Sequence, residues 1–144
     1  KTCDKNINGY VKFSEFGDLT KIKVKLSGVK PGYHGFHIHE AGDIRDNCNG
    51  ACKHYNPFGV SHGGQNSITT HVGDLGNIIS SNKESFGSIT VNNLSCNPKS
   101  KCSIVGRMII IHEDPDDLGK GDNEESKKTG NAGKRLACGI IGIC

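Results

Sequence analysis

The stretch His34-Gly-Phe-His37-Ile-His39-Glu-Ala-Gly-Asp43 decides the fold and the chemistry of this chain of 144 residues. Its centre has the composition of a β-strand, with His37 and His39 two positions apart. Successive side chains of a strand point to opposite faces, so both imidazoles point the same way. This spacing suits two bonds from one strand to one metal ion. The stretch therefore predicts a β-strand that carries a metal site on one face.

Further histidines extend this candidate site. The chain has seven, and all except His112, which ends a short apolar run, lie in its first half. A neutral imidazole keeps a free lone pair near pH 7, which makes histidine the commonest metal ligand. His54, His62 and His71 come at loop-like intervals and are followed by Asp74. Three imidazoles and a carboxylate suit tetrahedral zinc, and sites rich in imidazole also suit copper, so we expect more than one metal.

Composition narrows the class of protein. The length fits one domain over residues 1–144 with a real core, and the 20 glycines indicate many turns. The net charge is +3, with no block of Lys and Arg interleaved with aromatic residues, which argues against nucleic acid as a partner. No apolar run approaches the ~20 residues of a membrane span. We therefore expect neither a nucleic-acid nor a membrane partner.

Short strands separated by Gly and Pro turns predict the fold class. Apolar and β-branched runs predict strands over 9–13, 21–26, 86–91, 105–112 and 137–143, and no segment shows a sustained helical period. This pattern predicts an antiparallel sandwich or barrel. Two stretches, about 42–77 and 113–134, are too long to be mere connectors and are predicted to be functional loops. The first of them carries four of the candidate ligands.

Two motifs resemble the signatures of the copper/zinc superoxide dismutases. One is Gly35-Phe-His-Ile-His-Glu-Ala-Gly-Asp43, and the other is Gly130-Asn-Ala-Gly-Lys-Arg-Leu-Ala-Cys-Gly-Ile-Ile141. Between them, residues 71–77 and 119–130 resemble the zinc loop and the charged loop of that family. The similarity covers nearly the whole chain. It implies an all-β, eight-stranded antiparallel Greek-key barrel, an immunoglobulin-like sandwich, with two long functional loops.

The resemblance also implies one copper and one zinc per chain, with these ligands: His37, His39, His54 and His112 for copper, and His54, His62, His71 and Asp74 for zinc. The number of donors supports a shared ligand. Two four-coordinate metals need eight bonds, whereas the set has seven members. Only an imidazole, with two ring nitrogens, can join two ions as a single rigid linker, and the resemblance gives this bridging role to His54.

Other residues receive roles only through the resemblance. His34 is implied to be a structural core histidine, and Asp116 to hydrogen-bond ligands of both metals and orient them. Arg135 is implied to guide a small anion toward copper with its permanent charge. Four residues are implied to belong to the charged loop that shapes the substrate channel: Glu124, Glu125, Lys128 and Thr129. By themselves, Asp116 would be an ordinary loop acid and Arg135 a surface arginine.

The seven cysteines include one pair that the resemblance assigns. It pairs Cys48 with Cys138, which ties the first long loop to the last strand and stabilises by ~4–5 kcal/mol in the chain-entropy model. The others are Cys3, Cys52, Cys96, Cys102 and Cys144, which lie outside the family pattern. A local Cys96–Cys102 bridge and a Cys3–Cys144 bridge between paired terminal strands both stay open. The short stretch before Gly9 predicts a shortened first hairpin.

The implied activity is the disproportionation of superoxide to oxygen and hydrogen peroxide, with copper cycling between Cu(II) and Cu(I) and His54 as proton donor. A non-catalytic copper/zinc-binding protein and a copper-only enzyme are alternatives, and the complete ligand set argues against both. The resemblance further implies a homodimer and a copper chaperone as partner. It favours a cytoplasmic location, while the extra cysteines and a glycosylation sequon at Asn93 leave a secreted alternative open.

Overall fold

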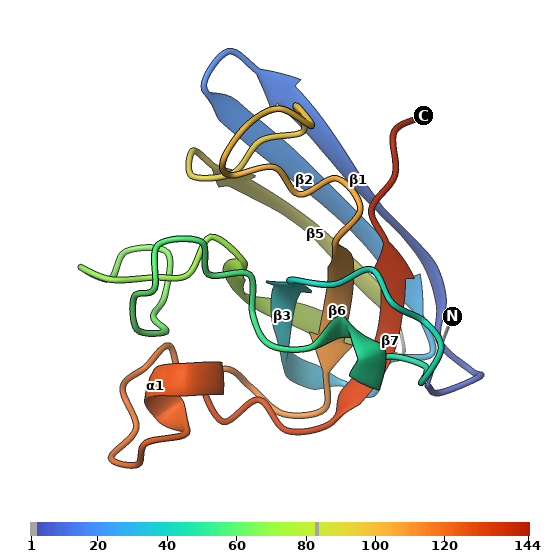
Figure 1. Cartoon of the computed structure of the whole chain (residues 1–144). Coiled ribbons are helices and arrows are strands. Elements are labelled where there is room, and N and C mark those ends of the chain that lie inside the picture. Colours follow the sequence, from blue (N-terminus) through green and yellow to red (C-terminus); the bar gives the residue numbers. More distant parts are fainter. Residues whose placement is uncertain (1–2, 83) are drawn as a thin grey trace.

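The computed structural model describes residues 3–82 and 84–144. Its strands form one antiparallel sheet that curls around the core (Figure 1). They are β1 (Asn8–Phe16), β2 (Leu19–Ser27), β3 (Gly32–His39), β4 (Asp74–Ser81), β5 (Glu84–Val91), β6 (Met108–His112) and β7 (Arg135–Ile140). The order in the sheet is β1-β2-β5-β4-β3-β6-β7, so β2 and β5, and β3 and β6, are neighbours through long crossovers. The predicted all-β class is confirmed.

The prediction of eight strands is wrong for the described residues, which form seven. β1 and β7 are the two edges of the sheet, and the order of strands does not pair them. A groove of about 760 Å³ lies between them, and its lining includes apolar side chains from β1, β6, β7 and the adjoining residues: Ile7, Val11, Phe13, Ile109, Ala137 and Ile141. A closed barrel needs this seam to be hydrogen-bonded. The sheet is therefore an open barrel.

The predicted strands coincide with observed ones, with three differences. β7 ends at Ile140, so the strand predicted over 137–143 extends three residues too far, into a segment that is not part of any strand. β6 begins at Met108 instead of residue 105, because the preceding segment turns, with the Arg107 amide donating to the carbonyl of Ile104. The sequence does not predict β4, whose first residues lie within the stretch of about 42–77 that is expected to be a loop. Polar and glycine residues at its start hide the alternation that identifies a strand. The long loops also contain two short helices, η1 (Asn49–Ala51) and α1 (Ser126–Thr129).

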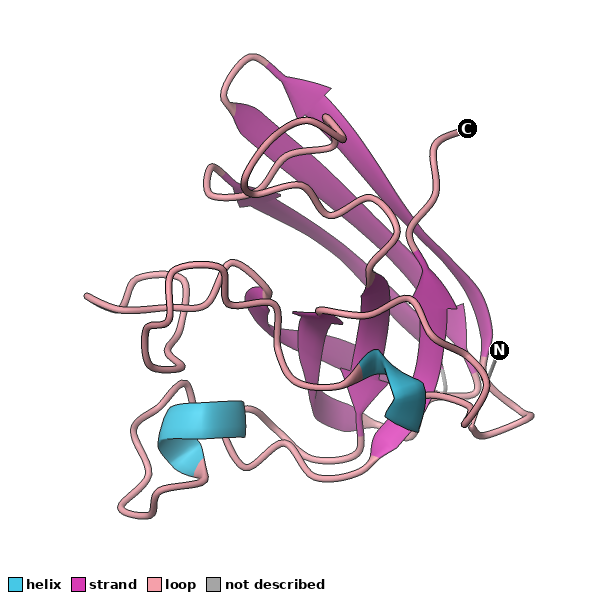
Figure 2. Cartoon of the chain, in the orientation of Figure 1, coloured by secondary structure: helices cyan, strands magenta, loops and turns pink. Residues whose placement is uncertain are grey.

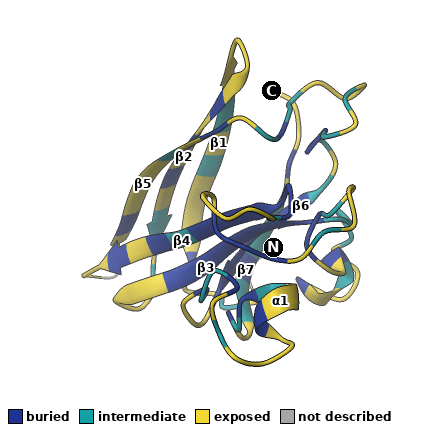
Figure 3. Cartoon of the chain, turned by 90° about the vertical axis from the view of Figure 1, so that its left-hand side faces the viewer, coloured by how far each residue is buried: buried dark blue, intermediate teal, exposed yellow. Residues whose placement is uncertain are grey.

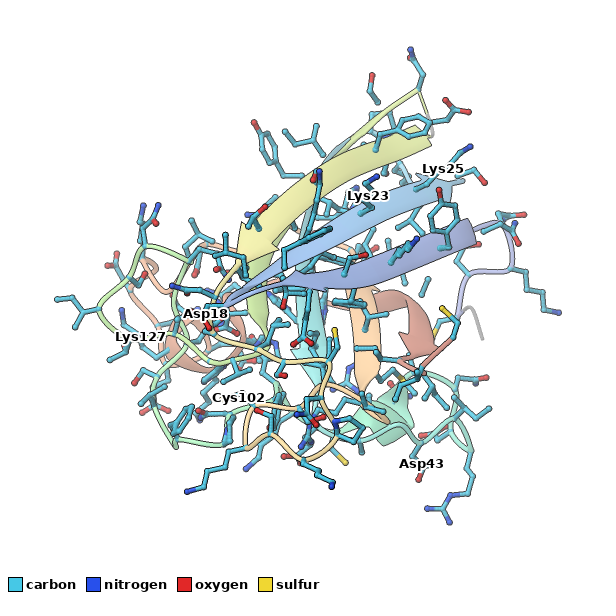
Figure 4. All side chains as sticks on the ribbon, turned by 90° about the horizontal axis from the view of Figure 1, so that it is seen from above. Asp18, Lys23, Lys25, Asp43, Cys102 and Lys127 are labelled. Carbon is cyan, nitrogen blue, oxygen red and sulfur yellow. A yellow bond between two sulfur atoms is a disulfide. The ribbon has the colours of Figure 1, made fainter. Side chains whose placement is uncertain are left out.

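Alternation along β2 shows how the sheet separates core from solvent. Ile22 and Val24 are buried, whereas Lys21, Lys23 and Lys25 are exposed. Figure 4 shows Lys23 and Lys25 projecting from the outer face of this strand. This is the period-two pattern of a strand with one face in water. The opposite, inner face contributes to a single main core.

β3 is buried on both faces, and this positions the candidate site. Phe36 and Ile38 join the apolar core, while His37 and His39 point to the opposite side; all four are at most 2% exposed. β3 lies between β4 and β6, which are also largely buried (Figure 3). The second face of β3 is covered by loops instead of solvent. The predicted strand with both imidazoles on one face is thus observed.

The two long loops provide that cover. The one carrying η1 and the one carrying α1 lie together on the same side of the sheet (Figure 2). They are joined directly, because the His62 amide donates to the carbonyl of Lys127 over 2.8 Å. Among the described residues, no helix has the length and apolarity that crossing a membrane would require.

Truncating a core side chain tests the packing of the sheet. Ile22→Ala is expected to lower the free energy of unfolding by about 2–5 kcal/mol, because Ile22 is fully buried and the change leaves a cavity. Urea denaturation followed by circular dichroism measures it. Ile68→Ala, at a fully exposed position, is the control and should change the free energy by less than about 0.5 kcal/mol. Equal effects of the two changes would contradict the described core.

Candidate metal centre

All the predicted metal ligands come together in the interior. None is more than 5% exposed. Their donor atoms form two clusters in which every atom lies within 4.8 Å of the others: the imidazole cluster, His37, His39, His54 and His112, and the aspartate cluster, His54, His62, His71 and Asp74. Strand pairing brings distant residues together, since Asp74 lies opposite His37 and His54 forms a bridge with His39.

Two members of the imidazole cluster are oriented by backbone carbonyls. Nδ1 of His39 donates to the carbonyl of Cys52 over 2.8 Å, and Nδ1 of His112 donates to that of Gly133 over 3.2 Å. A carbonyl oxygen only accepts, so in both rings Nδ1 carries the proton and Nε2 keeps its lone pair. These two Nε2 atoms are 3.3 Å apart. Their lone pairs therefore converge on one point.

The other two members of the imidazole cluster supply ring nitrogens with unused lone pairs. Nδ1 of His37 and Nε2 of His54 are buried and have no hydrogen-bond partner among the described residues. Buried polar atoms are almost always paired, because leaving one unpaired costs about 1–3 kcal/mol. Four ring nitrogens thus face a common point from which protons are absent. A copper ion fits this donor set.

The aspartate cluster is arranged around one carboxylate oxygen. Oδ1 of Asp74 lies 2.9 Å from Nδ1 of His54, 2.9 Å from Nδ1 of His62 and 3.1 Å from Nδ1 of His71. Nδ1 of His54 and His71 are 3.4 Å apart. Four donors at about 2.0–2.1 Å from a tetrahedral zinc ion lie about 3.3 Å from one another. The spacing of this cluster matches that requirement.

In His62 and His71, the ring protons point away from the centre of the aspartate cluster. Nε2 of His71 donates to the carbonyl of Val60 over 3.0 Å, which leaves the Nδ1 lone pair facing the Asp74 carboxylate. Nδ1 of His62 is also near that carboxylate but does not form a hydrogen bond with it. Lone pairs facing an anion repel it, and a cation between them removes the repulsion. The cluster therefore fits a metal ion.

His54 belongs to both clusters. Its ring centroid lies 4.1 Å from that of His37, and 4.9, 5.2, 5.4 and 6.2 Å from those of four other ligands, His39, His62, His71 and His112. Nδ1 faces Asp74, whereas Nε2 faces the imidazole cluster. The ring is thus placed to join two ions.

Asp116 connects the two clusters from behind. Its Oδ2 accepts from Nε2 of His37 over 2.7 Å, and its Oδ1 accepts from Nε2 of His62 over 2.8 Å. Both rings are thereby held with Nδ1 toward the clusters. Two residues that the sequence reasoning missed support this carboxylate. Asn77 exchanges two hydrogen bonds with the backbone of Asp116, and a Cβ at Gly130 would lie 1.9 Å from its Oδ1. The glycine was visible within a quoted motif, whereas Asn77 left no distinct signal.

Burial keeps the imidazole cluster in its ligand form. It lowers the pKa of His37, His39 and His54 below the usual value for histidine, and it lowers the pKa of His112 to about 4. Neighbouring histidines lower the pKa of His37 and His39 further. Metal ligation requires the neutral imidazole, so these rings are ready to bind at pH 7.

The aspartate cluster behaves differently because it contains negative charge. Burial would lower the pKa of His62, but the hydrogen bond to Asp116 and the negative charge of the nearby Asp74 raise it to about 9. Burial would raise the pKa of Asp74, but contacts with three histidines hold it well below its usual range. The Asp74 carboxylate is therefore ionised, and a proton and a metal ion compete to balance it.

Arg135 lies beside the imidazole cluster. It pairs with His112 where β6 and β7 meet. Burial is the main cause of the lowered pKa of His39 and His112, and the positive charge of Arg135 is a smaller cause. Nη1 donates to the carbonyls of Cys48 over 2.8 Å and Asn49 over 3.2 Å, and Nη2 donates to that of Cys52. The turn containing η1 therefore fixes this half-buried guanidinium.

The four predicted channel residues lie around α1. Glu124, Glu125, Lys128 and Thr129 are exposed or half-buried. Lys128 is 3.8 Å from Glu124, and Thr129 donates to Glu125 over 2.8 Å. These contacts join the side chains in two pairs, and neither contact involves the clustered histidines. His34 contacts the carbonyls of His112 and Lys30, as expected for a core histidine.

The cysteines follow the predicted pattern in part. Cys48 is paired with Cys138, with their Cα atoms 5.7 Å apart. Cys48 is also within disulfide reach of Cys3, whose Cα is 6.4 Å away. Neither open alternative is observed, because the free cysteines are Cys52, Cys96, Cys102 and Cys144. The expected pairing of terminal strands fails because Cys3 and Cys144 both lie outside strands.

Known proteins match this fold and centre. A family model described as copper/zinc superoxide dismutase matches residues 7–141. The chain belongs to this family. A superoxide dismutase [Cu-Zn] of Paramecium bursaria Chlorella virus 1 is 50% identical over 137 residues, which are 94% of this chain and 73% of the relative. The family assignment makes the chain an oxidoreductase of the copper/zinc type, and the two clusters are able to hold these two metals.

Two further relatives are named extracellular superoxide dismutase [Cu-Zn]. That of Onchocerca volvulus is 43% identical over 97% of this chain and 72% of the relative, and that of Drosophila melanogaster is 45% identical over 95% of this chain and 76% of the relative. A crystal structure of the clock protein EA4 superposes with a TM-score of 0.93 at 38% identity, covering 97% of this chain and 89% of that one.

Neutralising Asp116 tests its role behind both clusters. Asp116→Asn is expected to weaken metal binding by about 10–100-fold, because one amide cannot accept from both His37 and His62. Competition with a chelator, followed by metal analysis, measures this loss. Asp122→Asn, at an exposed position of the same loop, is the matched control and should bind as the unaltered chain does. Unchanged affinity in Asp116→Asn would contradict the geometry.

Proposed function

We propose that this chain disproportionates superoxide to oxygen and hydrogen peroxide at a copper ion beside a structural zinc ion. One observation carries the proposal: the two ring nitrogens of His54 face two different donor clusters in the buried interior. The proposed ligands are His37, His39, His54 and His112 for copper, and His54, His62, His71 and Asp74 for zinc. Membership of the copper/zinc superoxide dismutase family supports both metals and the reaction.

The proton chemistry follows from the position of His54. Bound copper supplies the one-electron redox chemistry, and zinc, which is d¹⁰, supplies only charge and structure. Nε2 of His54 is a buried ring nitrogen without a hydrogen-bond partner among the described residues. It can take up and return a proton while Nδ1 stays beside Asp74. His54 is thus the proposed proton donor, and Asp116 keeps the surrounding rings in orientation.

Arg135 is the proposed guide for the anionic substrate. Its guanidinium is permanently charged, lies beside His112 and is held by carbonyls of the η1 turn. The proposed channel residues, Glu124, Glu125, Lys128 and Thr129, act through the summed electric field and not by contact. A small anion approaching from solvent would meet Arg135 at the edge of the imidazole cluster.

The assembly and location belong to the proposal as well. We propose a single domain over residues 1–144, a homodimer formed near the terminal strands, and a copper chaperone as loading partner, all supported by the resemblance to the family. The residues that the resemblance places at this face are Gly42, Val105, Gly106, Ile141 and Ile143, of which Ile143 is 71% exposed and Ile141 is buried.

An oxidising, extracellular location is proposed in preference to the cytoplasm. Two relatives are named extracellular, and Cys48 forms a disulfide in the described structure. Stable disulfides normally form in oxidising compartments. Asn93, at the sequon, is half-buried with its Oδ1 buried, and its glycosylation stays a prediction.

Removing one ligand tests the catalytic assignment. His112→Ala is expected to abolish dismutation and to lose copper, because the ring is replaced by a methyl group that cannot bind it. Zinc content should be kept, since His112 is not part of the aspartate cluster. Metal analysis, a superoxide consumption assay and circular dichroism measure the three properties. Full activity in this variant would contradict the assignment, as would a metal-loaded unaltered chain that is inert toward superoxide.

Removing the charge of Arg135 tests substrate guidance. Arg135→Gln is expected to lower kcat/KM by about tenfold and to weaken its dependence on ionic strength, because electrostatic steering of the anion is lost. Pulse radiolysis over a range of salt concentrations measures both. Arg45→Gln removes an equal charge from a side chain that is 90% exposed and paired with Asp43, and it should leave kcat/KM within about twofold. Equal effects of the two changes would exclude a specific role for Arg135.

A further inference from the structure

Three cysteines form a group that shares no residue with the two metal clusters. The sulfur atoms of Cys3, Cys48 and Cys138 all lie within 4.8 Å of one another. Cα of Cys48 is 6.4 Å from that of Cys3 and 5.7 Å from that of Cys138. Both separations are within the range of about 4.4–6.8 Å that a disulfide spans. Cys48 can bond to one of them at a time, so the third sulfur lies beside an existing disulfide.

We propose that Cys3 is an exchange thiol and that Cys48 switches its disulfide partner between Cys138 and Cys3. The Cys3 thiolate attacks Sγ of Cys48, the bond from Cys48 to Cys138 breaks, and Cys138 leaves as a thiolate. Cys138 then takes up the proton that Cys3 released. One disulfide and one thiol are present before and after the step. The exchange therefore consumes neither oxidant nor reductant.

The surroundings suit Cys3 as the attacking group. Cys3 is exposed, whereas Cys48 is buried and Cys138 is half-buried. Exposure lets a thiol ionise and react, because water stabilises the thiolate. The segment is also held in place: the amide of Asp4 donates to the carbonyl of Leu136 on β7 over 2.8 Å, and Ile7 is buried. Asp4 thereby joins the segment before β1 to β7, the strand that carries Cys138, and Figure 1 shows this dark blue segment close to β7.

The exchange changes what holds the η1 turn. Cys48 begins this turn, and its carbonyl accepts from Arg135, while the carbonyl of Cys52 at the end of the turn accepts from His39. A bond to Cys138 ties the turn to β7, the strand that begins with Arg135. A bond to Cys3 ties it to the N-terminal segment instead. The exchange is thus expected to shift the carbonyls that position Arg135. This consequence rests on the proposed role of Arg135, whereas the exchange itself does not.

Irreversible trapping of thiols tests the exchange. The oxidised, metal-loaded chain is incubated with N-ethylmaleimide under native conditions, and the labelled and disulfide-linked peptides are mapped by mass spectrometry. In the unaltered chain, label is expected on both Cys3 and Cys138, with a Cys3–Cys48 peptide in the fraction labelled at Cys138. In Cys3→Ser, Cys138 should stay bonded to Cys48 and unlabelled. Cys144→Ser removes another exposed cysteine and should behave as the unaltered chain does.

Two outcomes of this mapping would overturn the exchange. In the first, Cys3 is the only one of the three converging cysteines that becomes labelled, however long the incubation. The other is labelling of Cys138 with Cys48 found bonded to Cys52, because that would make Cys52 the attacking thiol. Neither outcome depends on catalytic activity, so the test is independent of the proposed function.

A second variant tests the consequence for Arg135. Cys138→Ser should give a quantitative Cys3–Cys48 bridge and a kcat/KM about tenfold lower at equal metal content, since a displacement of about 1 Å in a positioning group costs up to ~100-fold. Cys3→Ser, with the original bridge, should keep the activity of the unaltered chain. A confirmed Cys3–Cys48 bridge with unchanged kcat/KM would overturn the control of Arg135. Absence of dismutation in every form, including the unaltered chain, would instead refute the proposed function.

Discussion

The burial of six imidazoles and a carboxylate without enough protons to pair them is the constraint on which the rest of the structure depends. Lone pairs of His39, His112 and His71 are directed inward because backbone carbonyls hold the opposite ring nitrogens. Such an arrangement is unfavourable unless cations occupy its centres. The clusters therefore need a rigid frame that keeps the donors together, and β3, which is buried on both faces, provides it.

The frame is assembled from distant parts of the chain. Pairing of β3 with β4 and β6 brings one ligand from each neighbouring strand to the site, Asp74 and His112, and the two long loops cover them. Asp116, in the second loop, joins the first loop by accepting from His62 and joins β3 by accepting from His37. Neutral rings in one cluster and an ionised carboxylate in the other give the two ions different surroundings. This difference is what a redox metal and a structural metal require.

The same loops connect the metal centre to the disulfide region. Backbone carbonyls of the η1 turn accept hydrogen bonds from Arg135 and His39. Cys48, the first residue of this turn, is linked to β7 through its disulfide with Cys138. A change in the disulfide that holds this turn is therefore expected to affect both Arg135, the proposed substrate guide, and His39, a proposed copper ligand. The metal centre and the cysteines are therefore connected through the η1 turn, although they are separate in the sequence.

The sequence by itself determined the strand character of β3, the shared face of His37 and His39, the all-β class and the candidate donors, because periodicity and residue chemistry are local properties. It did not reveal β4, whose polar start hides its alternation, or the open seam between β1 and β7. Only the tertiary structure decided that Asn77 supports Asp116, that Cys3 reaches Cys48, and which ring nitrogen of each histidine faces inward. These features depend on contacts between residues far apart in the chain, and no local pattern encodes such contacts.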